Sequence, residues 1–274
     1  MIRLIKNQTI MSLKDSSFFR CILYVVLSAL MIVMMTWTLG NALPALFSEA
    51  ISEISSSGKI SLGFIEFDSL EQIQAMNAGT LLQIAYASPL ITMIIGIFTI
   101  ESFSKNRENG YFAFLVTKKV SKWRMYTAKI IASYLLSLAM FFTYGLLILI
   151  ITTLMYDGHG FESSQPPAVF MWLITQLLVL FGIVCFYSMC ICLFGKIVKT
   201  IVFCVLMAVG APTVMSFLAA IFEREVINCL WIGNCSTGCN AWIDKIIPII
   251  FITLVYICLS LFIGGIIFMN RNIN

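Results

Sequence analysis

The chain has 274 residues, of which 60% are hydrophobic and only 11% are charged, with a formal net charge of +4. Soluble domains average about 45 to 50% apolar and about 25% charged residues, so this composition excludes an ordinary soluble domain. It indicates a protein whose surroundings are mostly lipid.

Six charge-free stretches are long enough to cross a bilayer, because a helical span needs about 20 apolar residues. They are residues 21–48, 81–100, 130–156, 168–195, 200–222 and 246–268. None shows the alternation of barrel strands, and an open sheet cannot satisfy its backbone in lipid. The sequence therefore predicts an all-α polytopic membrane protein, in which residues 1–274 form one transmembrane domain of six helices.

Residues 1–20 place Ile2, Ile5 and Leu13 among Lys and Arg residues. This pattern favours an amphipathic helix that lies in the headgroup region of the inner leaflet. An ordinary positively charged flank of the first span fits the same residues.

Residues 41–80 are predicted to form an exterior loop, and residues 223–245 form another. Apolar residues recur at helical spacing from Leu43 to Ile54, and Asp68 begins a DSLE stretch that is typical of a helix start. We expect two short amphipathic helices in the first loop, acting as a lid over a pore or as a connector packed on the ends of the spans.

Small and weakly polar side chains follow single faces of the second, third and fourth spans. The candidates for a translocation path are Ser88, Thr92, Tyr134, Ser137, Tyr144, Gln176 and Tyr187. Hydroxyl and amide groups also hold helices together in lipid, so helix packing explains the same residues. Pro89 and Pro212 are expected to kink their spans or to mark flexible points.

The loop 101–129 concentrates charged residues with aromatic residues between them. Its central stretch runs from an acid through aromatic residues to two lysines, and consists of Glu108, Gly110, Tyr111, Phe112, Phe114, Leu115, Lys118 and Lys119. Acid before base suits the dipole of a short helix, and an exposed aromatic ridge suits insertion into a groove on a partner. The loop is therefore predicted to dock a soluble protein.

The Lys and Arg residues are segregated. If the chain spans the membrane six times, all but three of the 17 fall on one side, and the exceptions are Lys59, Arg224 and Lys245. Because cytoplasmic loops carry an excess of Lys and Arg, both termini and the loop 101–129 are predicted to be cytoplasmic.

The nine cysteines divide into two groups. Those in or beside apolar spans are expected to pack as small hydrophobic residues: Cys21, Cys185, Cys190, Cys192, Cys204 and Cys258. Cys229, Cys235 and Cys239 share an exterior loop, so a disulfide between two of them is chemically allowed. A zinc site is the alternative, but the single histidine, His159, lies in another loop.

Motifs of catalysis are absent from the sequence. No charged residue lies inside a predicted span, which argues against an ion-coupled carrier or a proton pump. The chain has neither an HExxH pair nor a phosphate-binding GxxxxGK[ST] loop. We therefore expect this chain to be no enzyme and to bind no metal or cofactor itself.

The loop 101–129 resembles that of the type-2 ABC transporter permeases, the membrane-spanning subunits of ABC exporters. The matching positions are Glu101, Glu108-Asn109-Gly110-Tyr111, Phe114-Leu115, Ser121-Lys122 and Ala128-Lys129-Ile130. The amphipathic N-terminus, the six spans and the closing FMNRNI extend the likeness to nearly the whole chain. The departures from the family's pattern are Tyr111, Lys122, Ala128 and Asn272.

This resemblance implies that the loop contains a coupling helix, which sits on an ATPase subunit and transmits its closure to the spans. The implied partners are two ABC ATPase subunits, which use ATP and Mg, and a second permease chain in a homodimer or a sibling heterodimer. Membrane lipid and a peptide or hydrophobic small-molecule substrate complete the expected partners, and we expect no nucleic acid.

A path without fixed charges suits amphipathic or apolar cargo. The short outer loops resemble permeases that export antimicrobial peptides, such as bacteriocins or lantibiotics, for self-immunity; drug export fits the same features. The alternative is a non-transporting scaffold, sensor or immunity protein whose basic loop binds a soluble partner. The expected location is a bacterial plasma membrane.

Overall fold

The computed structural model describes residues 1–38, 60–62, 65–67, 81–82, 85–86, 88–108, 110–155, 166–235 and 246–270. Within these ranges the regular structure is helical, apart from one antiparallel hairpin. The hairpin pairs β1 (Ile60–Leu62) with β2 (Ile65–Phe67). It lies in the predicted exterior loop 41–80, where the two expected amphipathic helices fall outside the described residues.

Five helices in the described part of the chain are long and apolar enough to cross a membrane. They are α2 (Ser16–Trp37), α9 (Lys122–Met155), α10 (Pro166–Phe194), α11 (Ile197–Phe222) and α12 (Ile246–Asn270). The chain is therefore a multi-pass helical membrane protein. The predicted span 81–100 overlaps α7 (Pro89–Glu108), which is not among the five, so the sixth crossing stays a prediction.

Several helices continue past the boundaries set by the charge-free stretches. α7 runs on to Glu108 and α9 already begins at Lys122, so the predicted loop 101–129 contracts to the residues between these two helices. With 34 residues, α9 is about 51 Å long, well over the roughly 30 Å of a hydrocarbon core. The charged first turns of α9 therefore extend beyond the hydrocarbon core. They remain helical because the backbone hydrogen bonds of a helix are made within the segment itself.

The two proline positions differ. Pro89 is the first residue of α7, where the missing N–H would be unsatisfied in any case, so it does not kink this helix. Pro212 lies inside α11, and the kink or flexible point expected there stays a prediction.

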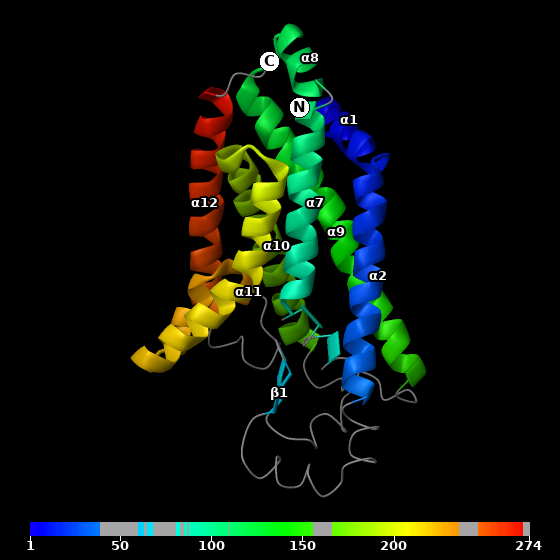
Figure 1. The fold of residues 1–274 in the computed structure, drawn as a ribbon, viewed down its shortest axis with the longest axis vertical. Helices are drawn as coiled ribbons and strands as arrows, with labels where there is room; N and C mark the ends of the chain where they lie inside the picture. The colour runs from blue at the N-terminus through cyan, green and yellow to red at the C-terminus, as the bar shows by residue number, and fades with distance from the viewer. Residues whose placement is uncertain are drawn as a thin grey trace, which may run out of the picture.

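The helices form a bundle with α10 at its centre (Figure 1). α10 packs against α12, α7 and α9, while α9 also packs against α1 (Ile2–Leu13) and α2. Two thirds of the apolar part of α10 is buried, against 11% of that of α11, which diverges from the bundle toward one end. Lipid is therefore the expected neighbour of most of α11.

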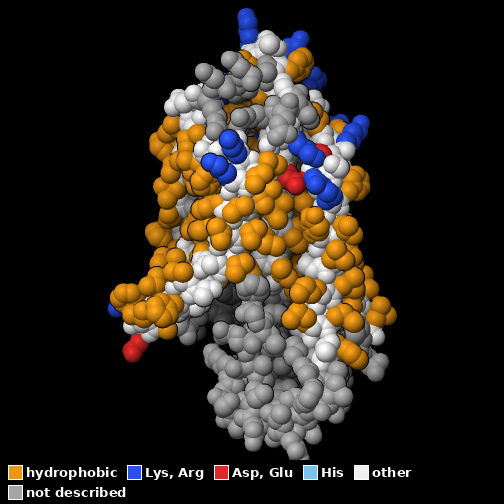
Figure 2. Space-filling view, viewed as in Figure 1, with side chains coloured by type: hydrophobic (Ala, Val, Ile, Leu, Met, Phe, Trp, Pro, Cys, Tyr) orange, Lys and Arg blue, Asp and Glu red, His pale blue; other side chains and the backbone are white. Residues whose placement is uncertain are grey.

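The two ends of the bundle differ in charge. Figure 2 shows Lys and Arg side chains gathered at one end, beyond a band of hydrophobic side chains. This end carries α1, α8 (Tyr111–Thr117) and the last turn of α12, and we call it the basic end. The arrangement agrees with the predicted charge segregation, and the cytoplasmic position of the termini stays a prediction.

Two ion pairs connect the first helices to α7 at the basic end. Asp15 caps α2 by accepting a hydrogen bond from the Ser17 amide at 3.3 Å, and it also pairs with Lys105 of α7. Arg20 pairs with Glu101 of α7 at 2.9 Å. α1 and α2 are thereby fixed relative to the end of α7.

Candidate functional site

The short helix α8 is set off from its neighbours by two left-handed residues. Gly110, with φ of 65°, turns the chain at the end of α7 and begins α8. Lys119, with φ of 58°, ends it: the Lys119 amide donates to the Val116 carbonyl at 2.9 Å and the Val120 amide to the Leu115 carbonyl at 3.1 Å. This pair of bonds is a Schellman motif, which closes the helix without a glycine.

One side of α8 faces the bundle. Phe112 and Leu115 are buried, and the Phe112 ring meets the Phe268 ring of α12 edge-on at 5.3 Å. Tyr111 is half-buried, and burial raises the pKa of its hydroxyl. α8 is therefore held to α12 by an aromatic contact rather than carried on a loose loop.

The other side of α8 is exposed. The Phe114 side chain is 56% exposed, and the Lys118 amine lies 5.7 Å from the centre of its ring. Lys119 is exposed as well, while the side chain of Glu108 lies outside the described part of the chain. We call Phe114, Lys118 and Lys119 the outer face of α8. The predicted coupling set thus divides into residues that anchor the helix and residues that are free to meet a partner.

The candidate path residues lie inside the bundle rather than along an open channel. Six of them are buried: Ser88, Thr92, Ser137, Tyr144, Gln176 and Tyr187; Tyr134 is half-buried. Several bond to neighbouring backbone: the Tyr144 hydroxyl donates to the Ala85 carbonyl at 3.3 Å and the Tyr134 hydroxyl to the Leu177 carbonyl at 3.2 Å. These bonds tie helices together, as the packing alternative expects.

Two hydroxyls of this set have no hydrogen-bond partner among the described residues. They belong to Thr92 and Ser137. A buried hydroxyl without a partner lowers the stability of the fold by roughly 1 to 3 kcal/mol. A hydrogen bond from water or from a substrate group at either position would remove this cost.

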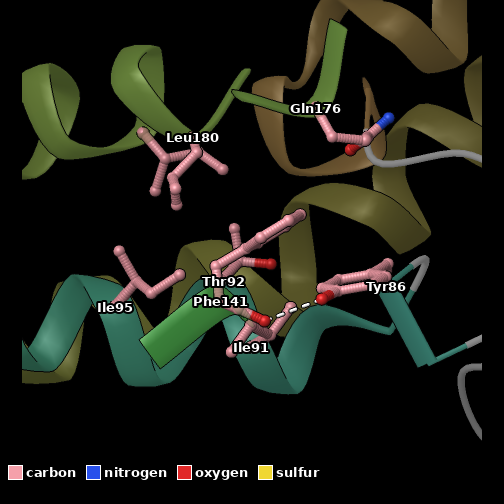
Figure 3. A pocket seen from close by; sticks show the side chains of 8 residues that line it. Tyr86, Ile91, Thr92, Ile95, Phe141, Gln176 and Leu180 are labelled. Atoms are coloured by element: carbon pink, nitrogen blue, oxygen red, sulfur yellow. Dashed lines mark hydrogen bonds between the residues drawn. The ribbon is translucent and has the colours of Figure 1, made fainter. Parts of the chain in front are cut away.

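A small pocket joins two of the path residues (Figure 3). Its lining comes from α7, α9, α10 and the helical residues shortly before α7, and consists of Tyr86, Ile91, Thr92, Ile95, Phe141, Gln176, Leu180 and Ile183. The Tyr86 hydroxyl donates to the Phe141 carbonyl at 2.7 Å, which leaves Thr92 and Gln176 as the path residues that bring polar atoms to the pocket. Such a lining suits an apolar group with one or two hydrogen-bonding atoms.

The chain at the end opposite α8 enters the bundle. The predicted exterior loop 223–245 contains η2 (Glu225–Leu230), which packs against α11 and α12, and η3 (Ile232–Cys235), which packs against α10 and α12. Its position outside the membrane stays a prediction. We call residues 225–235 the inserted segment.

Aromatic and amide contacts hold the inserted segment in place. Trp231 is buried, with its ring 5.5 Å from that of Phe186. The Tyr256 hydroxyl donates to the Leu230 carbonyl at 3.0 Å, and the Gln176 amide donates to the Cys235 carbonyl at 3.4 Å. Gln176 therefore touches both the pocket and the segment that closes the bundle beside it.

The structure carries the cysteines as free thiols wherever it describes them. Cys229 and Cys235 are both buried in the inserted segment, where the Cys235 thiol donates to the Cys229 carbonyl at 3.2 Å. Burial raises the pKa of the Cys235 thiol, which disfavours the reactive thiolate. Cys239 falls outside the described residues, and within them no group of His, Cys, Asp and Glu side chains is arranged to hold a metal.

One residue that sequence analysis assigned to the loop lies in the interior. Lys129 belongs to α9, is fully buried, and donates a hydrogen bond to the Ser12 hydroxyl of α1 at 2.8 Å. A lysine at the edge of an apolar stretch resembles any positive flank, so its position in the sequence carried no sign of burial.

Comparison with known proteins identifies no relative: no protein-family model, no curated protein and no solved structure matches the chain.

Proposed function

We propose that this chain is the membrane-spanning permease subunit of an ATP-driven ABC transporter, in which α8 is the coupling helix. The observation that carries the proposal is the two-sided structure of α8. A helix that transmits force needs firm attachment to the spans on one side and an open surface for the ATPase on the other.

The contacts of α8 give such a force a route into the spans. Phe112 bears on Phe268 near the end of α12, and Lys122 at the start of α9 donates to the Met269 carbonyl at 2.8 Å. A push on α8 would therefore move the ends of α9 and α12 together. Since α10 packs against both helices, the movement would reach the walls of the pocket.

The outer face of α8 supports a partner with an acidic rim and an apolar groove. Phe114 supplies an aromatic anchor, and Lys118 and Lys119 supply charges that steer encounter with an acidic surface. Phe112 and Leu115 act in this proposal as anchors within the chain. Two ATPase subunits, which use ATP and Mg, and a second permease chain complete the proposed transporter.

The proposed cargo is amphipathic or hydrophobic, such as an antimicrobial peptide or a drug. The pocket supports this class, because its lining is apolar and aromatic apart from the polar atoms of Tyr86, Thr92 and Gln176. A hydrated ion would find no charged ligand among the residues that line it. Bacteriocin or lantibiotic self-immunity is the form of export that this cargo suggests.

The test separates docking from folding with a matched pair of double variants. Phe114→Ala with Lys118→Glu alters the outer face of α8. Val198→Ala with Lys199→Glu makes a corresponding truncation and charge reversal at exposed positions of α11, where Val198 is 69% exposed. Each tagged chain is purified from its native cells in mild detergent, and the ATPase recovered with it is identified and measured by mass spectrometry.

We expect the α8 pair to reduce recovery of an ATPase at least roughly 30-fold, as the loss of an interface hot spot would. The α11 pair should behave as wild type. Equal recovery with all three chains would remove α8 as the dock. Recovery of a folded chain with a soluble partner that is no ATPase would favour the scaffold or sensor alternative.

A further inference from the structure

Three helices contribute pairs of buried polar side chains at the basic end. Each pair is one helical turn apart: Gln8 and Ser12 on α1, Ser102 and Asn106 on α7, and Lys129 and Ser133 on α9. None of the six is more than 5% exposed. Because two hydrogen bonds across helices connect the three pairs, we treat them as one group and call it the Lys129 cluster.

A chain of hydrogen bonds runs through the cluster. The Lys129 amine donates to the Ser12 hydroxyl at 2.8 Å, and the Ser12 hydroxyl lies 3.1 Å from that of Ser102. Since Ser12 accepts from the lysine, its own proton is available to Ser102. α1, α7 and α9 are thus joined by one polar path.

No acid forms a direct ion pair with the lysine in the described part of the chain. Asp15 attracts Lys129 electrostatically but is paired with Lys105, and Glu101 is paired with Arg20. A fully buried lysine whose hydrogen bond goes to a neutral hydroxyl is costly, and in a membrane protein it points to a further partner.

Other members of the cluster also lack partners. Neither the oxygen nor the nitrogen of the Gln8 amide has a hydrogen bond within the described residues, and the Asn106 nitrogen and the Ser133 hydroxyl are in the same position. The unused groups are mostly N–H donors: two on Gln8, two on Asn106, and the remaining protons of the Lys129 amine. A centre that combines a cation with surplus donors fits an anion with several oxygens.

The exposed side of α1 shows where such an anion would come from. Ile2, Ile10 and Met11 are exposed there beside Arg3 and Lys6, so the side of α1 that faces away from the bundle is both apolar and basic. That combination suits the headgroup region of a bilayer, in which phosphate groups are abundant. α1 therefore lies between the headgroup region, which its exposed side suits, and the buried donors on its other side.

We propose that the Lys129 cluster is a binding site for a phosphate group, with Lys129, Gln8 and Asn106 as its donors and α1 as the wall that admits it. Phosphate offers oxygens to all three donors and satisfies the lysine at the same time. The group can belong to an anionic phospholipid or to free inorganic phosphate. The proposal stands independently of the transport function.

The experiment measures the melting temperature of the full-length chain in a maltoside detergent, which contains no phosphate. The two probes are inorganic phosphate and phosphatidylglycerol, each compared with chloride at equal ionic strength. A ligand that binds the folded chain stabilises it by RT ln(1 + L/Kd), where L is the free ligand concentration, so the melting temperature rises with the concentration of a ligand that binds. The variants are Lys129→Met, Gln8→Leu and, as a control for the loss of a cation, Lys199→Met at an exposed position of α11.

We expect at least one probe to raise the melting temperature of wild type and of Lys199→Met. Lys129→Met should bind that probe roughly tenfold or more weakly, as expected when a charged hydrogen-bond donor is lost. A response to inorganic phosphate assigns the site to a soluble anion, and a response to phosphatidylglycerol alone assigns it to the headgroup. An equal response of wild type and Lys129→Met to both probes, or none in either, overturns the proposal.

Gln8→Leu carries the test if Lys129→Met does not fold. It replaces a buried amide without partners by an apolar side chain, so it should raise the melting temperature in detergent alone and reduce the gain from the probe. An unchanged gain from the probe would remove Gln8 from the site and contradict the proposal.

Discussion

The two ends of the bundle bury polar groups in different ways. At the basic end, α1, α7 and α9 enclose a cluster in which several donors have no partner, and α8 presents an exposed outer face. At the opposite end the inserted segment packs against α10, α11 and α12, and two of its backbone carbonyls accept hydrogen bonds from Tyr256 and Gln176. The unpartnered side-chain atom of this segment is an acceptor, the Asn228 oxygen.

This difference indicates different roles for the two ends. Buried donors without partners and exposed aromatic side chains raise the free energy of the folded chain, and binding of a ligand or partner would lower it again. The basic end is therefore the end at which we expect binding. A buried tryptophan and bonded carbonyls make a segment that stays in place. Substitutions at the opposite end should therefore cost mainly stability, while those at the basic end should cost less stability and change interactions.

The largest effect is expected at the buried tryptophan of the inserted segment. Trp231→Ala should lower the free energy of unfolding by about 3 to 5 kcal/mol, because it leaves a cavity against Phe186. The neighbouring Leu230→Ala is the control, since Leu230 is 49% exposed, and it should cost less than about 1 kcal/mol. Unfolding in mixed micelles measures both. Equal losses would mean that the segment does not seal this end.

A smaller effect is expected at the amide that binds the segment. Gln176→Leu should cost about 1 to 3 kcal/mol, because the Cys235 carbonyl loses its donor in a buried site. The exposed Ile174 of the same helix gives the control Ile174→Ala. Limited proteolysis between α11 and α12 should cleave Gln176→Leu faster than either the control or wild type. Identical cleavage would show that aromatic packing alone holds the segment.

The smallest effect is expected at the ion pairs of the basic end. Asp15→Asn keeps a good helix cap and loses the pair with Lys105 and the weaker attraction to Lys129, so it should cost about 1 kcal/mol and less at high salt. Asp15→Ala also loses the cap on α2 and should cost about 1 to 2 kcal/mol at any salt concentration. Thermal unfolding at low and high salt compares the two. A large, salt-independent cost of Asp15→Asn would contradict the view that charges here contribute little to the fold.

The sequence predicted the features that depend on composition and period. Apolar length predicted the membrane helices, and the segregation of Lys and Arg predicted which end would carry α1 and α8. The short helix itself was expected between Glu108 and Lys119, because an acid, a glycine and two lysines surround an apolar stretch of the right length.

Features that depend on contacts between distant segments were not predicted. The stretch EVINCLWIGNC has no clear apolar period and is too short for a span, so nothing local in the sequence indicates that it packs against α10, α11 and α12. In the same way, the burial of Lys129 depends on α1 packing over α9, which is a tertiary contact. The division of α8 into two sides required the position of Phe268, more than 150 residues away in the sequence.

The left-handed residue that ends α8 reveals a trade-off between stability and function. Glycine adopts this conformation without a steric penalty, whereas a residue with a Cβ atom pays roughly 1 to 2 kcal/mol. Lys119 therefore makes the turn less stable than glycine would, and its exposed side chain offers no contact within the described chain that offsets the cost. The charge of Lys119 points into solvent rather than toward the rest of the chain. Lys119→Gly would therefore be a natural substitution for raising stability, and it would remove a positive charge from the outer face of α8.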